Sequence, residues 1–356
     1  MAKHAQVSPA TVSRVINQPE KVSQERVRAV RRAMKALDYS PAPLSNRRGP
    51  KSRQIAAKSV GVWFVGAQQT PSLNWFQDQV IQMRPSMTRC RVHVSMYYSE
   101  TNAEIPSPIR QREVDGVIIQ GMEPASSCWP VLREMPNVWF MTRRSTDYPG
   151  DYVEPDNLAN GLMAADYLIS RGHSRLVALN TDPDYSAIAI RTDAFLQHCG
   201  SRRISASAIN GTPKDHPAYL DTHPRDGEVN TLVRRWAAMS PRPTGVYLPA
   251  DHFCGSFLRA ARHLDLKPER DFELILGNRS PMIYPNLSYQ PTAIDINLPT
   301  LVKMVVDHLL WRIDNFNSPG RVGLSVTPTL RPAPGISLAQ HLDMADPAEF
   351  PSAVSL

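Results

Sequence analysis

Near the N-terminus, hydrogen-bonding side chains and one cation recur on one side of a short predicted helix. Ser8 and Pro9 suit the cap and the first position of that helix, because serine accepts a backbone N–H and proline needs to donate none. Val12, Val15 and Ile16 follow at helical spacing and give the helix an apolar side. The other side can hydrogen-bond base edges and phosphates in a DNA major groove. The residues that we expect to contact DNA on this helix are Ser8, Pro9, Ala10, Thr11, Ser13, Arg14 and Asn17.

Within this set, the residue types predict different contacts. Ala10, Thr11 and Arg14 are the predicted base readers, with thymine methyl groups as the apolar targets. The serines and the asparagine are expected to contact phosphates and so to set the register. An ordinary capped amphipathic helix fits the same pattern when it is taken alone. A turn at 17–20 and a longer predicted helix over 24–37 favour a compact DNA-binding unit.

The basic residues of the chain are concentrated in the same region. Residues 1–53 carry 12 Lys and Arg against 3 Asp and Glu, a net charge of +9, whereas the rest of the chain carries −2. This distribution is expected when a small domain that binds nucleic-acid phosphates is attached to a near-neutral sensor. A solvated basic surface without a partner is the alternative interpretation.

The composition bounds the class of protein. The chain has 356 residues, 42% of them hydrophobic, which is enough for two or three globular units. No apolar run reaches the roughly 18 residues of a membrane span, and no signal-peptide pattern is present, so we expect a cytoplasmic, nucleoid-associated protein with no membrane partner. No nucleophile–base pair, metal-ligand spacing or phosphate-binding glycine loop stands out, so we expect no enzyme, metal or cofactor. The widely spaced cysteines are Cys90, Cys128, Cys199 and Cys254.

From residue 59 on, short aliphatic runs alternate with helical stretches. Predicted strands of the first half lie at 60–65, 92–98, 114–120, 137–141 and 152–153, with a helix at 75–83. After a helix over 158–170, the rhythm begins again with strands at 176–179, 245–248 and 273–277 and helices at 191–199 and 255–264. This alternation predicts parallel sheets with crossover helices. Two such units in series predict a bilobed α/β body with a ligand cleft at the carboxyl ends of the strands.

Two sets of residues resemble the lactose-repressor (LacI) family of bacterial transcription regulators. The first set is the helix from Val7 to Asn17, the start of the next helix at Val22-Ser23, and its exit, LDYSP at 37–41. The second set lies in the body and comprises VDGVI at 114–118, Asp156-Asn157 with Gly161, LISRGH at 168–173, Arg191 with Phe195, Asp251 with Gly255, Gly277, and PTAID at 291–295. The resemblance covers roughly residues 1 to 336. It implies an all-α helix-turn-helix headpiece followed by a periplasmic-binding-protein-like body of two doubly wound parallel-sheet lobes.

The resemblance also implies a division of the chain. We expect a headpiece over 1–40, a basic hinge over 41–58, an N-lobe over 59–155 plus about 292–318, a C-lobe over 156–291 plus about 319–336, and a tail over 337–356. In the family the first headpiece helix begins before the position of Met1, so this headpiece is expected to be N-terminally short. Gln6 stands where the family has a turn glycine, and a positive φ there costs about 1 kcal/mol.

The hinge departs from the family at one position. In family members it folds into a short helix on the operator, and a leucine wedges into the minor groove. Arg48 occupies that position here. Because arginine favours the negative potential of a narrow minor groove, we expect Arg47 and Arg48 to contact the minor groove or phosphates, with less kinking of the duplex. A flexible basic tether is the alternative.

Several body residues are expected to bind a small-molecule effector. The family uses an arginine at the position of Arg191, at the start of a second-lobe helix, to hydrogen-bond sugar hydroxyls or a carboxylate. A structural salt bridge between the lobes is the alternative. Trp75 and Phe76 follow the first strand, where an aromatic ring can stack on the apolar face of a sugar or belong to the core.

Two departures concern the chemical class of the effector. Asp251 matches the aspartate of the family's Asn-Asp pair, but Ala250 replaces the asparagine. After Gly277 the family has an aromatic residue and two acids, whereas this chain has Asn278 and Arg279. Both a neutral sugar and a uronate or other anion therefore remain open. The expected effector-binding residues are Trp75, Phe76, Arg191, Asp251, Asn278 and Arg279.

These features together predict a ligand-responsive regulator that binds double-stranded DNA. We expect a repressor of carbohydrate or sugar-acid metabolism genes that binds a pseudo-palindromic operator as a homodimer. A bilobed solute-binding sensor with weak or no DNA binding, because of the short headpiece, is the second interpretation. An enzyme on the same scaffold is the third, and no catalytic constellation supports it.

Overall fold

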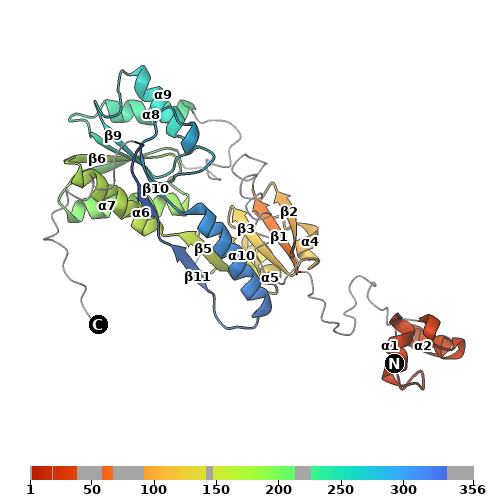
Figure 1. The fold of residues 1–356 in the computed structure, drawn as a ribbon. Coiled ribbons are helices and arrows are strands. Elements are labelled where there is room, and N and C mark those ends of the chain that lie inside the picture. The colour runs from red at the N-terminus through yellow and green to blue at the C-terminus, as the bar shows by residue number, and fades with distance from the viewer. Residues whose placement is uncertain are drawn as a thin grey trace, which may run out of the picture. The chain divides into compact units, whose positions relative to one another are not determined.

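The computed structural model describes residues 2–17, 19–37, 58–66, 92–141, 147–212 and 226–334. The chain divides into two compact units, Met1–Ala56 and Ala57–Leu356. Figure 1 traces the helices and strands of both units in chain order. Each unit has a hydrophobic core of its own. The predicted helix over 75–83, the hinge residues 41–57 and the tail over 337–356 lie outside the described residues.

The smaller unit is a helical headpiece. Its described elements are α1 (Pro9–Asn17), the 3-10 turn η1 (Pro19–Lys21) and α2 (Gln24–Ala36). Ala5, Val15, Val30 and Ala33 form its buried core. Both helices therefore bury one side against a shared core, as their apolar spacing predicted. Residues 2–6, before α1, form turns.

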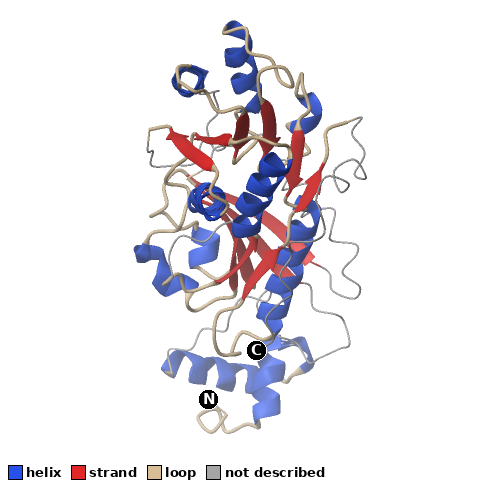
Figure 2. Ribbon diagram, turned by 90° about the vertical axis from the view of Figure 1, so that its left-hand side faces the viewer, coloured by secondary structure: helices blue, strands red, loops and turns tan. Residues whose placement is uncertain are grey.

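The larger unit contains two six-stranded sheets, which define two lobes, and Figure 2 shows the strands of each lobe flanked by helices. The first sheet has the order β11-β5-β4-β3-β1-β2, and all its neighbouring strands are parallel. Its strands are β1 (Lys58–Val65), β2 (Val92–Ser99), β3 (Gly116–Gly121), β4 (Asn137–Phe140), β5 (Asp151–Pro155) and β11 (Gly323–Val326). The described helices of this lobe are α4 (Ser107–Arg110), η4 (Ser126–Cys128), α5 (Trp129–Leu132) and α10 (Leu298–Asp314).

Strand β1 explains why the first sheet is covered on both faces. Val60, Val62 and Phe64 belong to the core cluster that includes residues of α10. Trp63 and Val65 belong to the opposite cluster, which includes residues of α4 and α5. Successive side chains of a strand point to opposite faces, so a strand without polar positions is buried on both sides. The apolar run at 60–65 correctly predicted a strand of this kind.

The second sheet has the order β12-β10-β9-β8-β6-β7, and only β12 is antiparallel to its neighbour. Its strands are β6 (Arg175–Asn180), β7 (Ser205–Asn210), β8 (Gly245–Leu248), β9 (Glu273–Leu276), β10 (Thr292–Asp295) and β12 (Thr329–Arg331). The described helices of this lobe are α6 (Asn157–Ser170), α7 (Ser186–Ser201), α8 (Asp226–Ala237), α9 (Cys254–His263) and η6 (Tyr284–Asn286).

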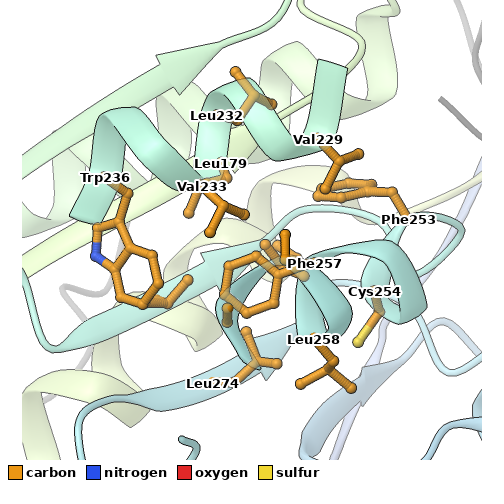
Figure 3. Packing of buried hydrophobic residues seen from close by; sticks show 14 of the residues in the cluster. Leu179, Val229, Leu232, Val233, Trp236, Phe253, Cys254, Phe257, Leu258 and Leu274 are labelled. Carbon is orange, nitrogen blue, oxygen red and sulfur yellow. The ribbon is translucent and has the colours of Figure 1, made fainter. Parts of the chain in front are cut away.

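Helices also cover both faces of the second sheet. On one face α8 and α9 contribute to the largest buried cluster, and on the other α6 and α7 contribute to a second one. Figure 3 shows the first cluster, in which Val233 and Trp236 of α8 lie toward Phe257 of α9 and Leu274 of β9. The ring centroids of Trp236 and Phe257 lie 5.7 Å apart. The fold class predicted for the body, two doubly wound lobes, is confirmed.

The chain passes between the lobes three times, after β5, after β10 and after β11. The predicted lobe boundaries differ from the structure at two strands. Residues 292–295, expected in the N-lobe, form β10 and pair with β9 of the second sheet. Residues 323–326, expected in the C-lobe, form β11 and pair with β5 of the first sheet. Pairing between residues far apart in the chain determines which sheet a short strand joins, and the local pattern does not contain that information.

Candidate functional site

The first candidate site is the solvent side of α1. Its exposed members are Ser8, Pro9, Ala10, Ser13 and Arg14, with Thr11 half-buried. The Ser8 hydroxyl accepts the backbone N–H of Thr11 at 3.1 Å, so the predicted N-cap is present. The side chain of Asn17 lies outside the described part of the structure. The helix thus presents the polar groups that were expected to contact DNA, and their individual contacts remain predictions.

The turn before α1 has the backbone conformation that the sequence suggested. Gln6 has a φ of 49°, in the left-handed region that glycine adopts without a steric penalty. The turn is closed by the backbone N–H of Val7, which donates to the carbonyl oxygen of Ala2 at 3.1 Å. Gln6 therefore occupies a position that favours glycine.

The second candidate site centres on Arg191 in the second lobe. Arg191 lies in the second turn of α7, which begins at Ser186, and not at the start of the helix as predicted. Gly161 of α6 faces it, and a β-carbon at position 161 would clash with the carbonyl oxygen of Arg191. The absence of a side chain at Gly161 lets the backbones of α6 and α7 approach closely, which fixes the position of Arg191.

The guanidinium of Arg191 is buried, with 2% of the residue exposed. Its Nε donates to Oδ1 of Asn157 at 2.8 Å. Its Nη1 donates to the carbonyl oxygens of Pro249 at 2.7 Å and Gly277 at 3.3 Å, and to Oδ1 of Asn278 at 2.8 Å. All of these acceptors are neutral. Its Nη2 donates to none of the described residues.

The electrostatic environment of Arg191 is unusual for a buried cation. Burial lowers its pKa below the ordinary value, and the nearby charge of Asp251 is among the effects that oppose this shift. Arginine nevertheless stays protonated at physiological pH. No carboxylate of the described residues forms an ion pair with it. Buried charges are normally paired, so this guanidinium is suited to an anionic or strongly hydrogen-bonding ligand.

Four buried side-chain atoms have no hydrogen-bond partner among the described residues: Nε1 of Trp139, Nε of Arg242 and two amide atoms. Nδ2 of Asn157 is one, on the same amide whose oxygen binds Arg191. Oε1 of Gln120 is the other, near the carboxyl end of β3 in the first lobe. Unsatisfied buried polar groups are uncommon and can mark ligand contacts. The sequence reasoning missed both as site residues, although Asn157 was part of the family signature.

The remaining predicted effector residues have different environments. Asp251 is buried and its Oδ2 accepts the backbone N–H of Ser280 at 2.7 Å, which ties the loop after β8 to the loop after β9. Burial raises the pKa of Asp251, and the Ser280 hydrogen bond opposes that shift. Arg279 is exposed, with its guanidinium 4.6 Å from the ring centroid of Tyr284. Asn278 contacts Arg191 directly.

Four predicted site residues lie outside the described part of the chain: Arg47, Arg48, Trp75 and Phe76. Within the described residues, no group of three or more His, Cys, Asp or Glu side chains is placed to hold a metal ion. None of the described helices is both long and apolar enough to cross a membrane.

Two known families match separate parts of the chain, one in each compact unit. Residues 1–42 match the family described as bacterial regulatory proteins, lacI family. Residues 165–332 match the family described as periplasmic binding protein-like domain. The chain is 24% identical over 286 residues to the HTH-type transcriptional repressor PurR of Escherichia coli O1:K1, covering 77% of this chain and 78% of the relative.

Solved structures share the fold. The lac repressor dimer bound to operator and the anti-inducer ONPF matches with a TM-score of 0.63 and 17% identity, covering 93% of this chain and 96% of that chain. The transcriptional regulator CelR in complex with cellobiose matches with a TM-score of 0.60 and 18% identity, covering 93% and 97%. A LacI family regulator from Enterococcus faecium with bound ribose matches with a TM-score of 0.62 and 15% identity, covering 78% and 97%.

A DNA-binding helical headpiece joined to a periplasmic-binding-protein-like body defines a class of ligand-responsive transcription regulators. Residues 1–42 thus match the lacI family of bacterial regulatory proteins, residues 165–332 match the periplasmic binding protein-like domain, and 77% of the chain is similar to a repressor with the name PurR. Proteins of this family bind DNA and are not enzymes.

Proposed function

We propose that this regulator is a repressor that binds a pseudo-palindromic operator as a homodimer and responds to a sugar acid. The exposed α1 face supplies the DNA contacts, with Ala10, Thr11 and Arg14 as base readers. Arg47 and Arg48 of the hinge contact the minor groove or phosphates. The relatives that are named repressors support the direction of regulation. A repressor of chromosomal genes acts in the cytoplasm, at the nucleoid.

The observation that carries the effector assignment is the buried Arg191 with only neutral partners. Two of the solved relatives contain cellobiose and ribose, which supports a carbohydrate-like ligand. A neutral sugar leaves the charge of Arg191 without a counterion, whereas a carboxylate compensates it and accepts from Nη2. Nδ2 of Asn157 is a second available donor beside the guanidinium. We therefore favour an aldonate or uronate over its neutral parent sugar.

Trp75, Phe76, Asp251 and Arg279 complete the proposed effector site with different roles. The aromatic residues stack on the sugar ring. Asp251 holds the loops after β8 and β9 together, so it positions Asn278 through the backbone of Ser280. Arg279, over the ring of Tyr284, adds positive potential near the same loop.

Isothermal titration calorimetry with matched pairs of ligands tests the effector class. Gluconate and glucuronate are compared with glucose, and galacturonate with galactose. One charge-assisted hydrogen bond contributes about 1.5–3 kcal/mol, so we expect the acid to bind roughly 10- to 100-fold more tightly than the neutral sugar. Exclusive binding of neutral sugars would overturn the assignment of an acid.

Two variants locate the binding energy. Arg191→Gln is expected to abolish the preference for the acid, because the amide removes the positive charge. Arg259→Gln removes one exposed charge from the same lobe, where Arg259 pairs with Asp226, and serves as the control. It is expected to leave both affinities unchanged. Thermal unfolding of both variants checks that they fold.

Gel-shift and sedimentation experiments test the DNA side independently. DNA from upstream of the protein's own gene and its neighbours is titrated with heparin as competitor, and the stoichiometry is measured by analytical ultracentrifugation. We expect two chains per operator and loss of the complex in Arg14→Gln. A protein that binds the acid but no DNA would support the alternative, a solute-binding sensor.

A further inference from the structure

A row of cations on α2 has no part in the proposed function. Arg28, Arg31, Arg32 and Lys35 follow one another at spacings of three, one and three residues, and all are exposed. Side chains three and four residues apart are neighbours on a helix. None of these cations forms an ion pair or hydrogen bond within the described headpiece. We call these four residues the α2 row.

The α2 row points away from the headpiece core. Val30 and Ala33 on the same helix are buried, with 0% and 4% exposed. At about 100° per residue, the α2 row is centred on the opposite side of the helix. Helix α1 buries Val15 against the same core. The exposed face of α1 and the α2 row therefore both point away from the shared core, and they lie on different helices.

The spacing of the α2 row indicates a polyanionic partner. Like charges at i and i+4 destabilise a helix, and both Arg28 with Arg32 and Arg31 with Lys35 have this spacing. An anionic surface removes that repulsion. The row extends roughly 10 Å along the helix, a length over which duplex DNA carries about six negative charges.

We propose that the α2 row is a second, sequence-independent binding surface for duplex DNA. A protein that holds one duplex through α1 then holds a second duplex through α2. This goes beyond the proposed operator binding, which uses the α1 face and the hinge arginines. The contact is with phosphates, so it carries no sequence information and weakens steeply with salt.

A two-duplex capture experiment tests this proposal in the intact protein. One 30-base-pair duplex of mixed sequence is fixed to beads, and a fluorescent duplex of the same sequence is added with the protein. The variant R28Q/R31Q/R32Q/K35Q is expected to retain the fluorescent duplex at least 10-fold less than wild type. Its binding to the bead-bound duplex alone is expected to fall less than threefold. For the second duplex, the slope of the logarithm of the binding constant against the logarithm of the salt concentration is expected to be about 2 to 4 less steep in the variant.

Two controls keep the result interpretable. Glutamine is a good helix former, so the variant should keep its helical circular dichroism. The variant R28K/R31K/R32K keeps all the charges and should retain the second duplex like wild type. Undiminished retention by the glutamine variant would show that two α1 faces bridge the duplexes and would overturn the proposal. Equal loss of single-duplex and second-duplex binding would place the row on the first duplex and overturn it as well.

Discussion

Gln6 has a backbone conformation that a side chain disfavours. Its φ of 49° is required by the turn that brings Val7 back to Ala2, just before the Ser8 cap. Left-handed backbone costs a non-glycine residue about 1 kcal/mol. A glycine avoids this cost, but its greater freedom in the unfolded chain offsets part of the stabilisation. The headpiece carries this strain next to its proposed DNA-reading helix.

We predict that Gln6→Gly stabilises the headpiece by about 0.5–1 kcal/mol. Hydrogen–deuterium exchange in the intact protein should show about two- to fivefold slower exchange of the α1 and α2 amides. Gln24→Gly is the matched control, because Gln24 lies in the first turn of α2 and glycine there weakens the helix. Faster exchange in Gln6→Gly would show that the turn does not limit headpiece stability.

Arg191 and Arg279 show what single-residue reasoning can predict. Both were expected at the effector site. Arg191 is buried and contacts Asn278, whereas Arg279 is exposed and stacks over the ring of Tyr284. The family resemblance locates an arginine in the chain but does not give its burial. The partnerless Nδ2 of Asn157 was also unpredictable, because hydrogen-bond satisfaction depends on every group that folding brings to it.

Helix α10 is anchored to the first sheet by a buried charged cluster. Asp151 of β5 accepts from Nε2 of His308 at 2.8 Å and from Nε of Arg312 at 2.6 Å, and the three side chains are 4–7% exposed. Burial raises the pKa of Asp151, but the hydrogen bonds from His308, Arg312 and Val322 outweigh it and hold the pKa below its ordinary value. One carboxylate thus joins β5 to α10 and, through the N–H of Val322, to the segment that leads into β11.

We predict that Asp151→Asn destabilises the protein by about 3 kcal/mol, because it leaves Arg312 buried without its counterion. Asp307→Asn is the matched control on the same helix. Asp307 pairs with Lys303 at the surface, so its loss should cost less than about 1 kcal/mol. Urea unfolding at neutral pH measures both changes in the free energy of unfolding. Equal losses in the two variants would show that the buried cluster stabilises the protein no more than the surface pair does.

The same carboxylate predicts the pH dependence of stability. Because the folded-state pKa of Asp151 is lowered, its stabilisation is complete above the ordinary carboxyl range and is lost as the pH falls through the lowered pKa. The urea midpoint is measured between pH 7 and pH 3. In the wild type, it should decrease once the pH is below about 4. In Asp151→Asn this acid-induced loss should be smaller. An identical pH profile in the two proteins would contradict this origin.

The elements differ in how well their sequence predicted them. The apolar run at 245–248 matched its strand residue for residue, because burial on both faces leaves no polar position. The edge strand β7, SASAIN, was not predicted, since its small and polar residues lack both an apolar run and clear alternation. The amphipathic helix α8 was also missed, although Val229, Leu232, Val233 and Trp236 have helical spacing.

At the scale of the whole body, the first crossover between the lobes contacts the proposed effector site, and the second and third crossovers contact each other. Asn157, directly after the first crossover, accepts from Arg191. At the second crossover, Nδ2 of Asn297 donates to the carbonyl oxygen of Thr327 at 2.9 Å and to Oγ1 of Thr329 at 3.2 Å, both in the third. Asn297 has a φ of 56°, which asparagine tolerates better than most residues. A ligand held by Arg191 and Asn157 would therefore act on the connection between the lobes.

This arrangement predicts reciprocal coupling between the proposed effector and operator. If the sugar acid changes operator affinity by some factor, the operator must change sugar-acid affinity by the same factor, commonly between 5- and 150-fold. Calorimetric titration of the acid with and without bound operator, together with operator titration with and without the acid, measures both factors. Arg191→Gln should bring both toward one, because it removes the ligand contact beside the first crossover. The acid could change the operator affinity and yet bind equally well to free and operator-bound protein. That result would contradict coupling through one binding equilibrium.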